Sequence, residues 1–292
     1  MEATKSIAEI VSEAEKRGCP ISQIAIEDEE KNLGLERAEL WRRMARLWEI
    51  MHQSVAAGAN SHLKSMSGLV GSESALMLKY AYRGLTLSGD GTSLAAARAL
   101  GVSIVNASMG KIVAAPTAGS CGILPAVLLT VAEKVGADED RIIGALFTAA
   151  RIGSVIDDIA STSGAQGGCQ AECGAASCMA AAAAVELAGG TPTQAAHAGA
   201  LSLKSVIGLV CDPVAGLVEI PCVKRNAFGA VNALLAADMA LAGIESKIPI
   251  DEVIEAVREV GSLMPDALKE TGRGGLANTP TAKEIAKKMR PE

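Results

Sequence analysis

The chain has 292 residues, of which 49% are hydrophobic and only 2% aromatic, and its formal net charge is -6 at pH 7. This length and hydrophobic content suffice for a large buried core in one large or two modest domains. The acidic balance argues against a nucleic-acid partner, because such binding requires a basic surface. With so few aromatic residues, the core must be packed from Ala, Leu, Ile, Val and Met, which favours closely packed helices.

The N-terminal sequence MEATKS lacks the basic and apolar regions of a secretory signal. The longest apolar stretch, 175–190, is mostly Ala and contains Glu186, so it is too short and too weakly apolar to span a bilayer. We therefore expect no membrane partner and a cytoplasmic location. In a reducing compartment the seven cysteines are expected to be thiols or metal ligands rather than disulfides.

Residues 1–56 have the pattern of amphipathic helices. Within 36–51, apolar residues repeat at helical spacing, and both tryptophans lie on the same stripe: Leu40, Trp41, Met44, Leu47, Trp48 and Met51. Such a stripe is expected to face the core, and a partner-binding surface is the alternative.

From residue 57 to 125, helical patterns alternate with Gly/Ser loops at 67–71, 87–91 and 115–122. Helix start signals then recur at four residues, Asp138, Thr191, Asp251 and Thr279, with Asp251 predicted to cap a helix that begins at Glu252. The Thr191 site has Pro192 at the first helical position and Gln194 three residues after the cap, which is a capping box.

Only two short segments, 102–105 and 111–114, have a strand-like pattern. No repeat of fixed period and no interdomain linker is evident. We therefore predict a mainly α fold, with a single all-helical domain over residues 1–292. Residues 1–56 would form its N-terminal amphipathic region, and the remainder a core with Gly-rich loops around a site.

Three cysteines, Cys169, Cys211 and Cys222, lie in loops rich in Gly, Ala and Pro. Thiolates at the edges of such loops can converge on one metal, and three ligands leave a coordination position open for Lewis-acid catalysis. Cys173 and Cys178 are close to Cys169 in sequence, but they lie in an Ala-rich helical pattern that suits core packing. Spacing alone therefore leaves the ligand set open.

Two common metal patterns are absent. The sequence has no Cys-x2-Cys pair, and three histidines are too few for a His-rich site. A metal centre in this chain would have to use thiolates.

Four segments rich in small residues follow one another along the chain: 114–125 (AAPTAGSCGILP), 163–172 (SGAQGGCQAE), 208–226 (GLVCDPVAGLVEIPCVKRN) and 269–277 (KETGRGGLA). In this order they resemble the bacterial iron–sulfur-dependent L-serine dehydratases. Several long motifs in the same order make a chance similarity implausible, and the resemblance covers most of the chain.

The resemblance implies that Cys169, Cys211 and Cys222 hold a [4Fe–4S] cluster whose fourth iron binds the substrate, L-serine. That iron would stabilise charge as the C–O bond breaks, and a base would remove the Cα proton. The resulting aminoacrylate would give an imine, which hydrolyses to pyruvate and ammonia. Pyridoxal phosphate is not required, and no feature of the sequence suggests a Lys Schiff base.

In that family a Ser-Ser-His-Thr segment belongs to a second module, which is either a separate beta chain or fused to the catalytic part. This sequence contains no such segment. The chain therefore resembles the alpha subunit, and we expect a beta subunit to complete the site.

Candidate substrate-binding residues lie beside the proposed ligands. Thr117 and Ser120 belong to a small-residue loop whose hydroxyl and N–H groups could hold a carboxylate, although a tight turn between helices is an equal interpretation. Soon after Cys222 come three polar residues, Lys224, Arg225 and Asn226. One of them could bind the substrate carboxylate or offset the negative charge of the cluster. The alternative is that they form a solvated basic surface.

The catalytic base stays unassigned, with His62 and Lys224 as candidates by residue type only. Arg273 with the two following glycines could form an anion-binding loop, but Gly-Gly is also common in ordinary turns.

Two other functions remain open. A related cluster lyase could remove sulfide from L-cysteine, since leaving-group preference depends on contacts that the sequence does not reveal. A non-catalytic helical scaffold with buried cysteines would belong to a different functional class, but it does not explain why three cysteines occur in loop motifs.

Overall fold

The computed structural model describes residues 5–60 and 62–289. These residues form thirteen α-helices and contain no β-strand, which confirms the predicted mainly α fold. The helices are α1 (Ile7–Arg17), α2 (Ile21–Leu33), α3 (Arg37–Gly58), α4 (Glu73–Ala81), α5 (Asp90–Ala107), α6 (Ile123–Val135), α7 (Glu139–Ala160), α8 (Gly164–Gly167), α9 (Ala175–Leu187), α10 (Pro192–Lys204), α11 (Cys222–Leu241), α12 (Ile250–Leu263) and α13 (Pro280–Met289).

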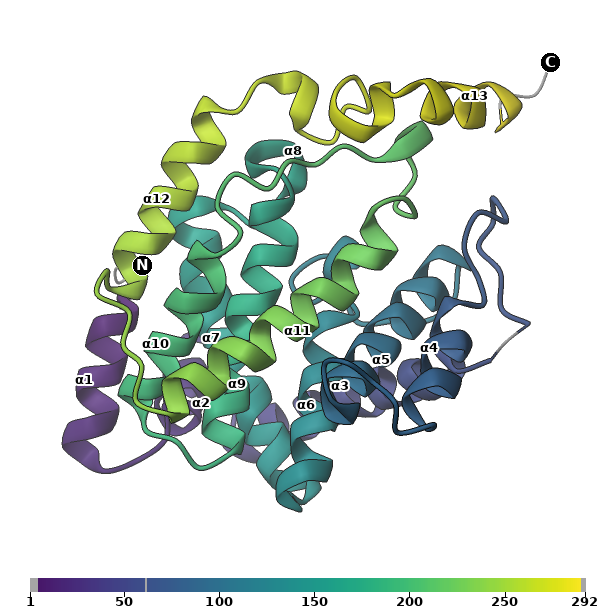
Figure 1. Ribbon diagram of the computed structural model, residues 1–292. Coiled ribbons are helices and arrows are strands. Elements are labelled where there is room, and N and C mark those ends of the chain that lie inside the picture. The colour runs from purple at the N-terminus through teal and green to yellow at the C-terminus, as the bar shows by residue number, and fades with distance from the viewer. Residues whose placement is uncertain (1–4, 61, 290–292) are drawn as a thin grey trace.

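Helix α9 is the centre of the molecule. Every residue from Ala175 to Leu187 is buried except Glu186, and α6, α7, α10 and α11 pack around it (Figure 1). A helix that is apolar on all sides is stable only when other helices cover it completely. The Ala-rich segment is therefore the core of a helical domain rather than a surface element.

Small residues let the surrounding helices approach α9 closely. A Cβ atom added at Gly199 of α10 would lie 3.1 Å from the Cys178 sulfur, and one added at Gly229 of α11 would lie 2.9 Å from the Ser177 hydroxyl oxygen. Both contacts are too short for a larger residue without displacement of a neighbour. The low aromatic content of the chain thus matches a core built on close backbone approach.

The N-terminal helices share this core. Ile7 and Ile10 of α1 belong to the same buried cluster as α9. Leu40, Trp48 and Met51 of α3 are also buried, which confirms that the amphipathic stripe predicted over 36–51 faces inward. Trp41 stacks on Phe147 of α7, whereas Leu47 is 40% exposed.

Three of the predicted helix caps are confirmed. Thr279 directly precedes α13, and its hydroxyl oxygen accepts a hydrogen bond from the backbone N–H of Ala282 at 3.4 Å. The Asp138 side chain accepts a hydrogen bond from the backbone N–H of Arg141 at the start of α7. Thr191 and Gln194 form the reciprocal capping box at the start of α10, with Pro192 in the first turn. These caps depend only on neighbours in sequence, so local pattern was sufficient to find them.

The structure contradicts the strand-like pattern of both short segments. Residues 102–105 lie inside α5, and 111–114 form neither a strand nor a helix. The short apolar run in α5 is buried among neighbouring helices. A buried run of this length has no periodicity that distinguishes strand from helix.

One apolar stretch of the described residues, Ala118–Val135, is long enough to cross a membrane by length and composition alone. In the structure 61% of it is buried inside the protein. Most of the stretch is α6, which packs against α9, α5 and α11.

Asp251 caps a different helix from the one predicted. Helix α12 begins at Ile250, two residues before the predicted start at Glu252, and its N-cap Pro249 has no side-chain cap. The two carboxylate oxygens of Asp251 instead accept hydrogen bonds from the backbone N–H groups of Ile7 (2.8 Å) and Ala8 (2.9 Å) at the start of α1. Asp251 therefore joins α12 to α1 across 243 residues of sequence.

Replacing Asp251 with Ala is expected to lower the free energy of unfolding by about 0.5–2 kcal/mol, the usual value of a capping side chain. The loss arises because two N–H groups of α1 no longer have a partner. Urea denaturation followed by circular dichroism measures it. Glu252→Ala, an exposed acidic residue in the same turn, is the control, and an equal loss in both variants would contradict this capping role.

Candidate metal centre

The three loop cysteines come from separate segments near the N-terminal end of α9. Cys169 directly precedes a π-helical turn, Gln170–Gly174, that leads into α9. Cys222 is the first residue of α11, and Cys211 lies in the loop between α10 and α11. Cys169 and Cys211 are each 3% exposed, and Cys222 is partly exposed. π-Turns are rare and occur often at functional sites.

The three thiols are close enough to influence one another electrostatically. Burial raises the pKa of Cys211, and negative charge on Glu172, Cys169 and Cys222 raises it further. Burial likewise raises the pKa of Cys222 to about 12, with further contributions from charge on Cys169 and Glu172. Thiolates crowded in this way require a compensating positive charge. Hydrogen bonds also join the segments that carry these cysteines, because the N–H of Gln170 donates to the Leu209 carbonyl at 3.0 Å and Arg225 of α11 donates to the Val210 carbonyl at 2.8 Å.

Cys169 differs from the other two because it already has favourable partners. A hydrogen bond from the Cys173 thiol, aided by the positive charge of Arg225, holds the pKa of Cys169 below its usual value although burial opposes this. The pKa of Cys173 is raised correspondingly. Cys173 therefore contacts a proposed ligand, while Cys178 lies fully buried inside α9 and has a pKa raised by burial alone.

The Cys211 segment is fixed mainly by backbone pairing and by one buried ion pair. The N–H of Cys211 donates to Leu268, and the N–H of Glu270 donates to Cys211. These bonds form an isolated bridge between the Cys211 loop and the segment after α12, which run side by side at the top of Figure 1. The predicted 208–226 and 269–277 motifs are therefore neighbours in space.

Arg225 joins the residues that flank Cys211 to helix α11. Its guanidinium donates to the Val210 carbonyl at 2.8 Å and lies 2.9 Å from the Asp212 carboxylate, which is almost fully buried. The other oxygen of Asp212 accepts the N–H of Leu276 at 2.7 Å. One Arg–Asp pair thus links three segments: α11, the Cys211 loop and the 269–277 segment.

Asn226 connects α11 to the 115–122 loop. Its side-chain oxygen accepts the N–H of Gly122 at 2.9 Å, and its amide nitrogen donates to the carbonyls of Gly119 (2.7 Å) and Cys222 (3.0 Å). The side chain is completely buried. These bonds use the acceptor and both donor hydrogens, so Asn226 positions the loop beside the cysteines.

The other tentative substrate-binding residues lie in the same region. Thr117 donates its hydroxyl hydrogen to Glu172 at 2.8 Å. Ser120 is fully buried beside Thr117. Lys224 is 45% exposed and forms an ion pair with Glu73 at the start of α4. The structure thus places all four residues around the cysteines, and their binding of substrate stays a prediction.

Carboxylates in this region were not recognised from the sequence. The ligand atoms of Glu172, Cys211 and Glu270 lie within 4.8 Å of one another, a grouping that could hold a metal ion. Burial raises the pKa of Glu172, and negative charge on Glu270 adds to this, although the hydrogen bond from Thr117 opposes it. The only sequence signal for Glu172 is a charged residue in an otherwise small and apolar motif.

Glu219 holds the loop that carries His62 close to the Cys222 segment. This buried carboxylate accepts a hydrogen bond from Ser65 at 2.6 Å and another from Ser67. His62 is exposed. Arg273 is also exposed, on the 269–277 segment that pairs with the Cys211 loop.

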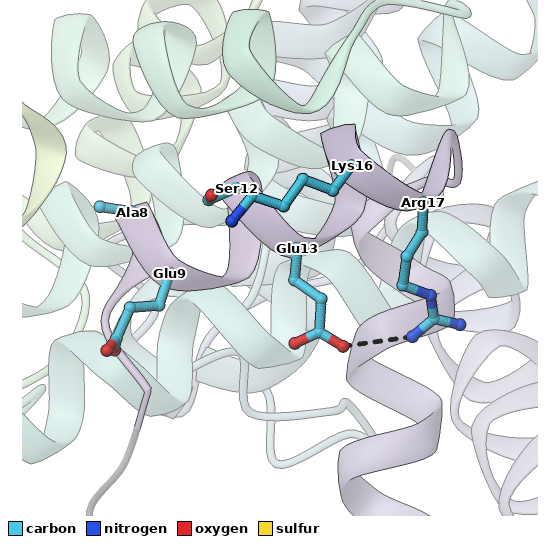
Figure 2. Close-up of a pocket in the computed structure, with 6 residues that line it drawn as sticks. All are labelled: Ala8, Glu9, Ser12, Glu13, Lys16 and Arg17. Carbon is cyan, nitrogen blue, oxygen red and sulfur yellow. Dashed lines mark hydrogen bonds and ion pairs between the residues drawn. The ribbon is translucent and has the colours of Figure 1, made fainter.

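A cavity of about 540 Å³ adjoins the site on one side of α11, where Cys173, Lys224, Arg225 and Phe228 line it. Another hollow lies on the outer face of α1 (Figure 2), where surface side chains such as Glu9, Glu13 and Arg17 line it. Glu13 and Arg17 form an ion pair with each other. The α1 hollow contains no cysteine or histidine, so it is not a candidate for the chemistry.

A family profile described as "Serine dehydratase alpha chain" matches residues 16–277. The chain belongs to this family. It is 47% identical over 285 residues to a probable L-serine dehydratase alpha chain of Bacillus subtilis (strain 168), covering 98% of this chain and 95% of that one. It is 46% identical over 277 residues to the L-serine dehydratase alpha chain of Peptoniphilus asaccharolyticus, covering 95% of each.

A longer relative is L-serine dehydratase TdcG of Escherichia coli (strain K12), which is 38% identical over 283 residues. The match covers 93% of this chain but 61% of that relative. Family membership confirms the resemblance identified from the sequence motifs. The long relative also contains a substantial region that has no counterpart in the matched alignment.

The Arg225–Asp212 pair yields a stability prediction. Arg225→Gln leaves the buried Asp212 carboxylate without its cation, so the free energy of unfolding should fall by about 3–5 kcal/mol. Lys224→Gln removes only a partly exposed ion pair and should change it by about 0–1 kcal/mol. Urea titration of both variants tests this contrast. Equal midpoints for the two would refute the assigned role of Arg225.

Proposed function

We propose that this chain is the catalytic alpha subunit of an L-serine ammonia-lyase, in which Cys169, Cys211 and Cys222 hold a [4Fe–4S] cluster. The observation that carries the proposal is that hydrogen bonds join the three segments beside the cysteines: the N–H of Gln170 donates to the Leu209 carbonyl at 3.0 Å, and Arg225 donates to the Val210 carbonyl at 2.8 Å. The relatives named L-serine dehydratase support serine as the substrate.

The donor set suits an iron–sulfur cluster. Thiolates are the usual ligands of such clusters, and three of them leave one iron for the substrate. A bound cluster of this kind supplies a Lewis acid that helps the serine hydroxyl leave. Arg225 contributes positive charge next to Cys169, which favours the thiolate form needed for ligation.

The chain's own residues provide the surroundings for this chemistry. Asn226 fixes the 115–122 loop beside Cys222, and Thr117 of this loop donates a hydrogen bond to Glu172. Ser120 is buried in the same loop, where its hydroxyl contacts the Ala115 and Thr117 carbonyls. Removal of the Cα proton and departure of the hydroxyl as hydroxide, together one water, give an aminoacrylate. This tautomerises to an imine and takes up water to give pyruvate and ammonia. No pyridoxal phosphate is part of this proposal.

The proposal includes a beta subunit as partner. The relatives that match nearly end to end are named alpha chains, and the long single-chain relatives carry additional sequence. Glu270 and Arg273 lie exposed on the segment that pairs with the Cys211 loop. A second chain that covers this segment would exclude water from the site and could supply the base. His62 and Lys224 are the candidate bases on this chain.

A cysteine series tests the cluster assignment. After anaerobic purification together with the partner chain, Cys169→Ala, Cys211→Ala and Cys222→Ala should each lose iron, acid-labile sulfide and lyase activity, since each removes a ligand. Cys178→Ala and Cys121→Ala, which alter buried thiols outside the ligand set, are the controls and should keep both iron and colour.

Cys173→Ala is a further informative variant, because Cys173 contacts Cys169 without belonging to the proposed ligands. It should keep its iron. If Cys173→Ala loses the cluster while Cys211→Ala or Cys222→Ala retains it, the ligand set is wrong. A colourless, iron-free wild-type complex that still deaminates serine would overturn the cluster mechanism.

Kinetic measurements distinguish serine deamination from the competing activity, removal of sulfide from L-cysteine. We expect kcat/KM for L-serine to exceed that for L-cysteine by at least about tenfold, because a site specific for the hydroxyl discriminates in transition-state binding. The two substrates are supplied in competition to the anaerobic complex, and pyruvate, ammonia and sulfide are measured. Predominant sulfide release would instead assign the chain to cysteine desulfidation.

A further inference from the structure

The exposed aromatic residues of the chain belong to α4 and α11 and their immediate neighbours. The sequence contains two Trp, two Tyr and two Phe. Both tryptophans and Phe147 belong to the buried core or pack against it. The other three aromatic residues are exposed: Tyr80 of α4 by 40%, Tyr82 directly after α4 by 76%, and Phe228 of α11 by 75%. Half of the few aromatic side chains therefore do not serve the core.

Apolar side chains extend this exposed area along α4 and the loop that follows it. Leu76, Leu85 and Leu87 are largely exposed. The Tyr80 hydroxyl donates a hydrogen bond to the Leu85 carbonyl at 3.0 Å, which holds the loop against the end of the helix. Single exposed apolar residues are ordinary on a protein surface, whereas a cluster of them is typical of an interaction site.

An ion pair connects α4 to α11. Both helices pack on α5 (Figure 1), and Lys224 in the first turn of α11 pairs with Glu73 at the start of α4. Leu76 and Phe228 each lie one turn further along their helix, on the same face as the paired residue. The name α4–α11 surface is used below for six exposed residues: Leu76, Tyr80, Tyr82, Leu85, Leu87 and Phe228.

The charge beside this surface is opposite to that of the chain as a whole. Residues 74–89 contain Lys79 and Arg83, both exposed, and no Asp or Glu. The whole chain has a formal net charge of -6. Opposite potentials favour association and like charges oppose it. A surface that is apolar and locally basic therefore fits a partner whose contact surface is apolar and acidic.

A different protein chain fits this surface better than other occupants do. A second copy docked face to face would bring Lys79 and Arg83 close to the same two residues of the copy, because a two-fold contact uses one patch twice. A second copy that offered an acidic patch from elsewhere would make a head-to-tail contact, which closes only into a ring. Two cations are few for nucleic acid, whose binding depends on many phosphate contacts.

We propose that the α4–α11 surface binds the beta subunit, through a contact surface on that partner that is both acidic and apolar. This inference rests on the proposed function, which supplies the partner. Tyr82 and Phe228 act as anchors, since buried aromatic residues often dominate the energy of an interface. Phe228 also lines the cavity that adjoins the metal centre, so a chain bound here would cover that cavity.

A double substitution tests the two anchors. Tyr82→Asp combined with Phe228→Asp should weaken binding of the separately purified beta chain by at least about 100-fold, because two anchors are lost and two carboxylates face an acidic surface. Leu33→Asp, which alters an exposed leucine at the end of α2, is the control and should bind as the wild type does. Biolayer interferometry under anaerobic conditions measures the affinity, and urea titration shows that each variant is folded.

A charge reversal tests the acidic character of the partner. Lys79→Glu combined with Arg83→Glu keeps the aromatic residues and should weaken beta-chain binding by at least about tenfold at low salt. Added salt should weaken wild-type binding, and this dependence should be lost in the variant. Lys16→Glu is the matched control, because Lys16 is exposed in the last turn of α1 as Lys79 is in the last turn of α4.

Four results would overturn the inference. They are wild-type affinity in the Tyr82→Asp/Phe228→Asp variant, an equal loss in Leu33→Asp, wild-type binding that is independent of salt, and self-association of the alpha chain alone that the double variant abolishes in sedimentation velocity. The last result would assign the surface to a second copy. If the wild-type alpha chain binds no beta chain at all, the partner assignment in the proposed function fails instead.

Discussion

The complete burial of α9 is the constraint on which the rest of this structure depends. A helix with no polar face must be covered on every side, and four helices do so here. Its start at Ala175 follows directly from the π-turn and Cys169. The buried central helix therefore determines where Cys169 and Glu172 lie.

Around the start of α9, buried polar side chains hold the Cys211 loop and the 115–122 loop in place. Arg225 links both neighbours of Cys211 to α11 through Val210 and Asp212, and Asn226 links the 115–122 loop to the same helix. The first turns of α11 thus organise two of the loops that surround the site. Loops lack the regular hydrogen bonding of helices, so such side-chain bonds are needed to give them one conformation.

The same residues show how structural and chemical roles are divided at the site. Asn226 has its acceptor and both donor hydrogens committed to backbone groups, and Arg225 is committed to the Cys211 loop. Glu172 is different, because one of its oxygens lacks a strong partner. A buried polar group that the fold does not satisfy is a better candidate for ligand binding than one that it does.

The sequence by itself determined the helical class, the inward stripe of α3, the caps at Asp138 and Thr191, and, through its motifs, the family. These features depend on residues within a few positions of one another or on ordered motifs. Only the tertiary structure decided that Asp251 caps α1, that Arg225 and Asp212 join three segments, and that Glu172 lies beside Cys211. Each of these contacts joins residues from separate segments of the chain, and local periodicity carries no information about such pairs.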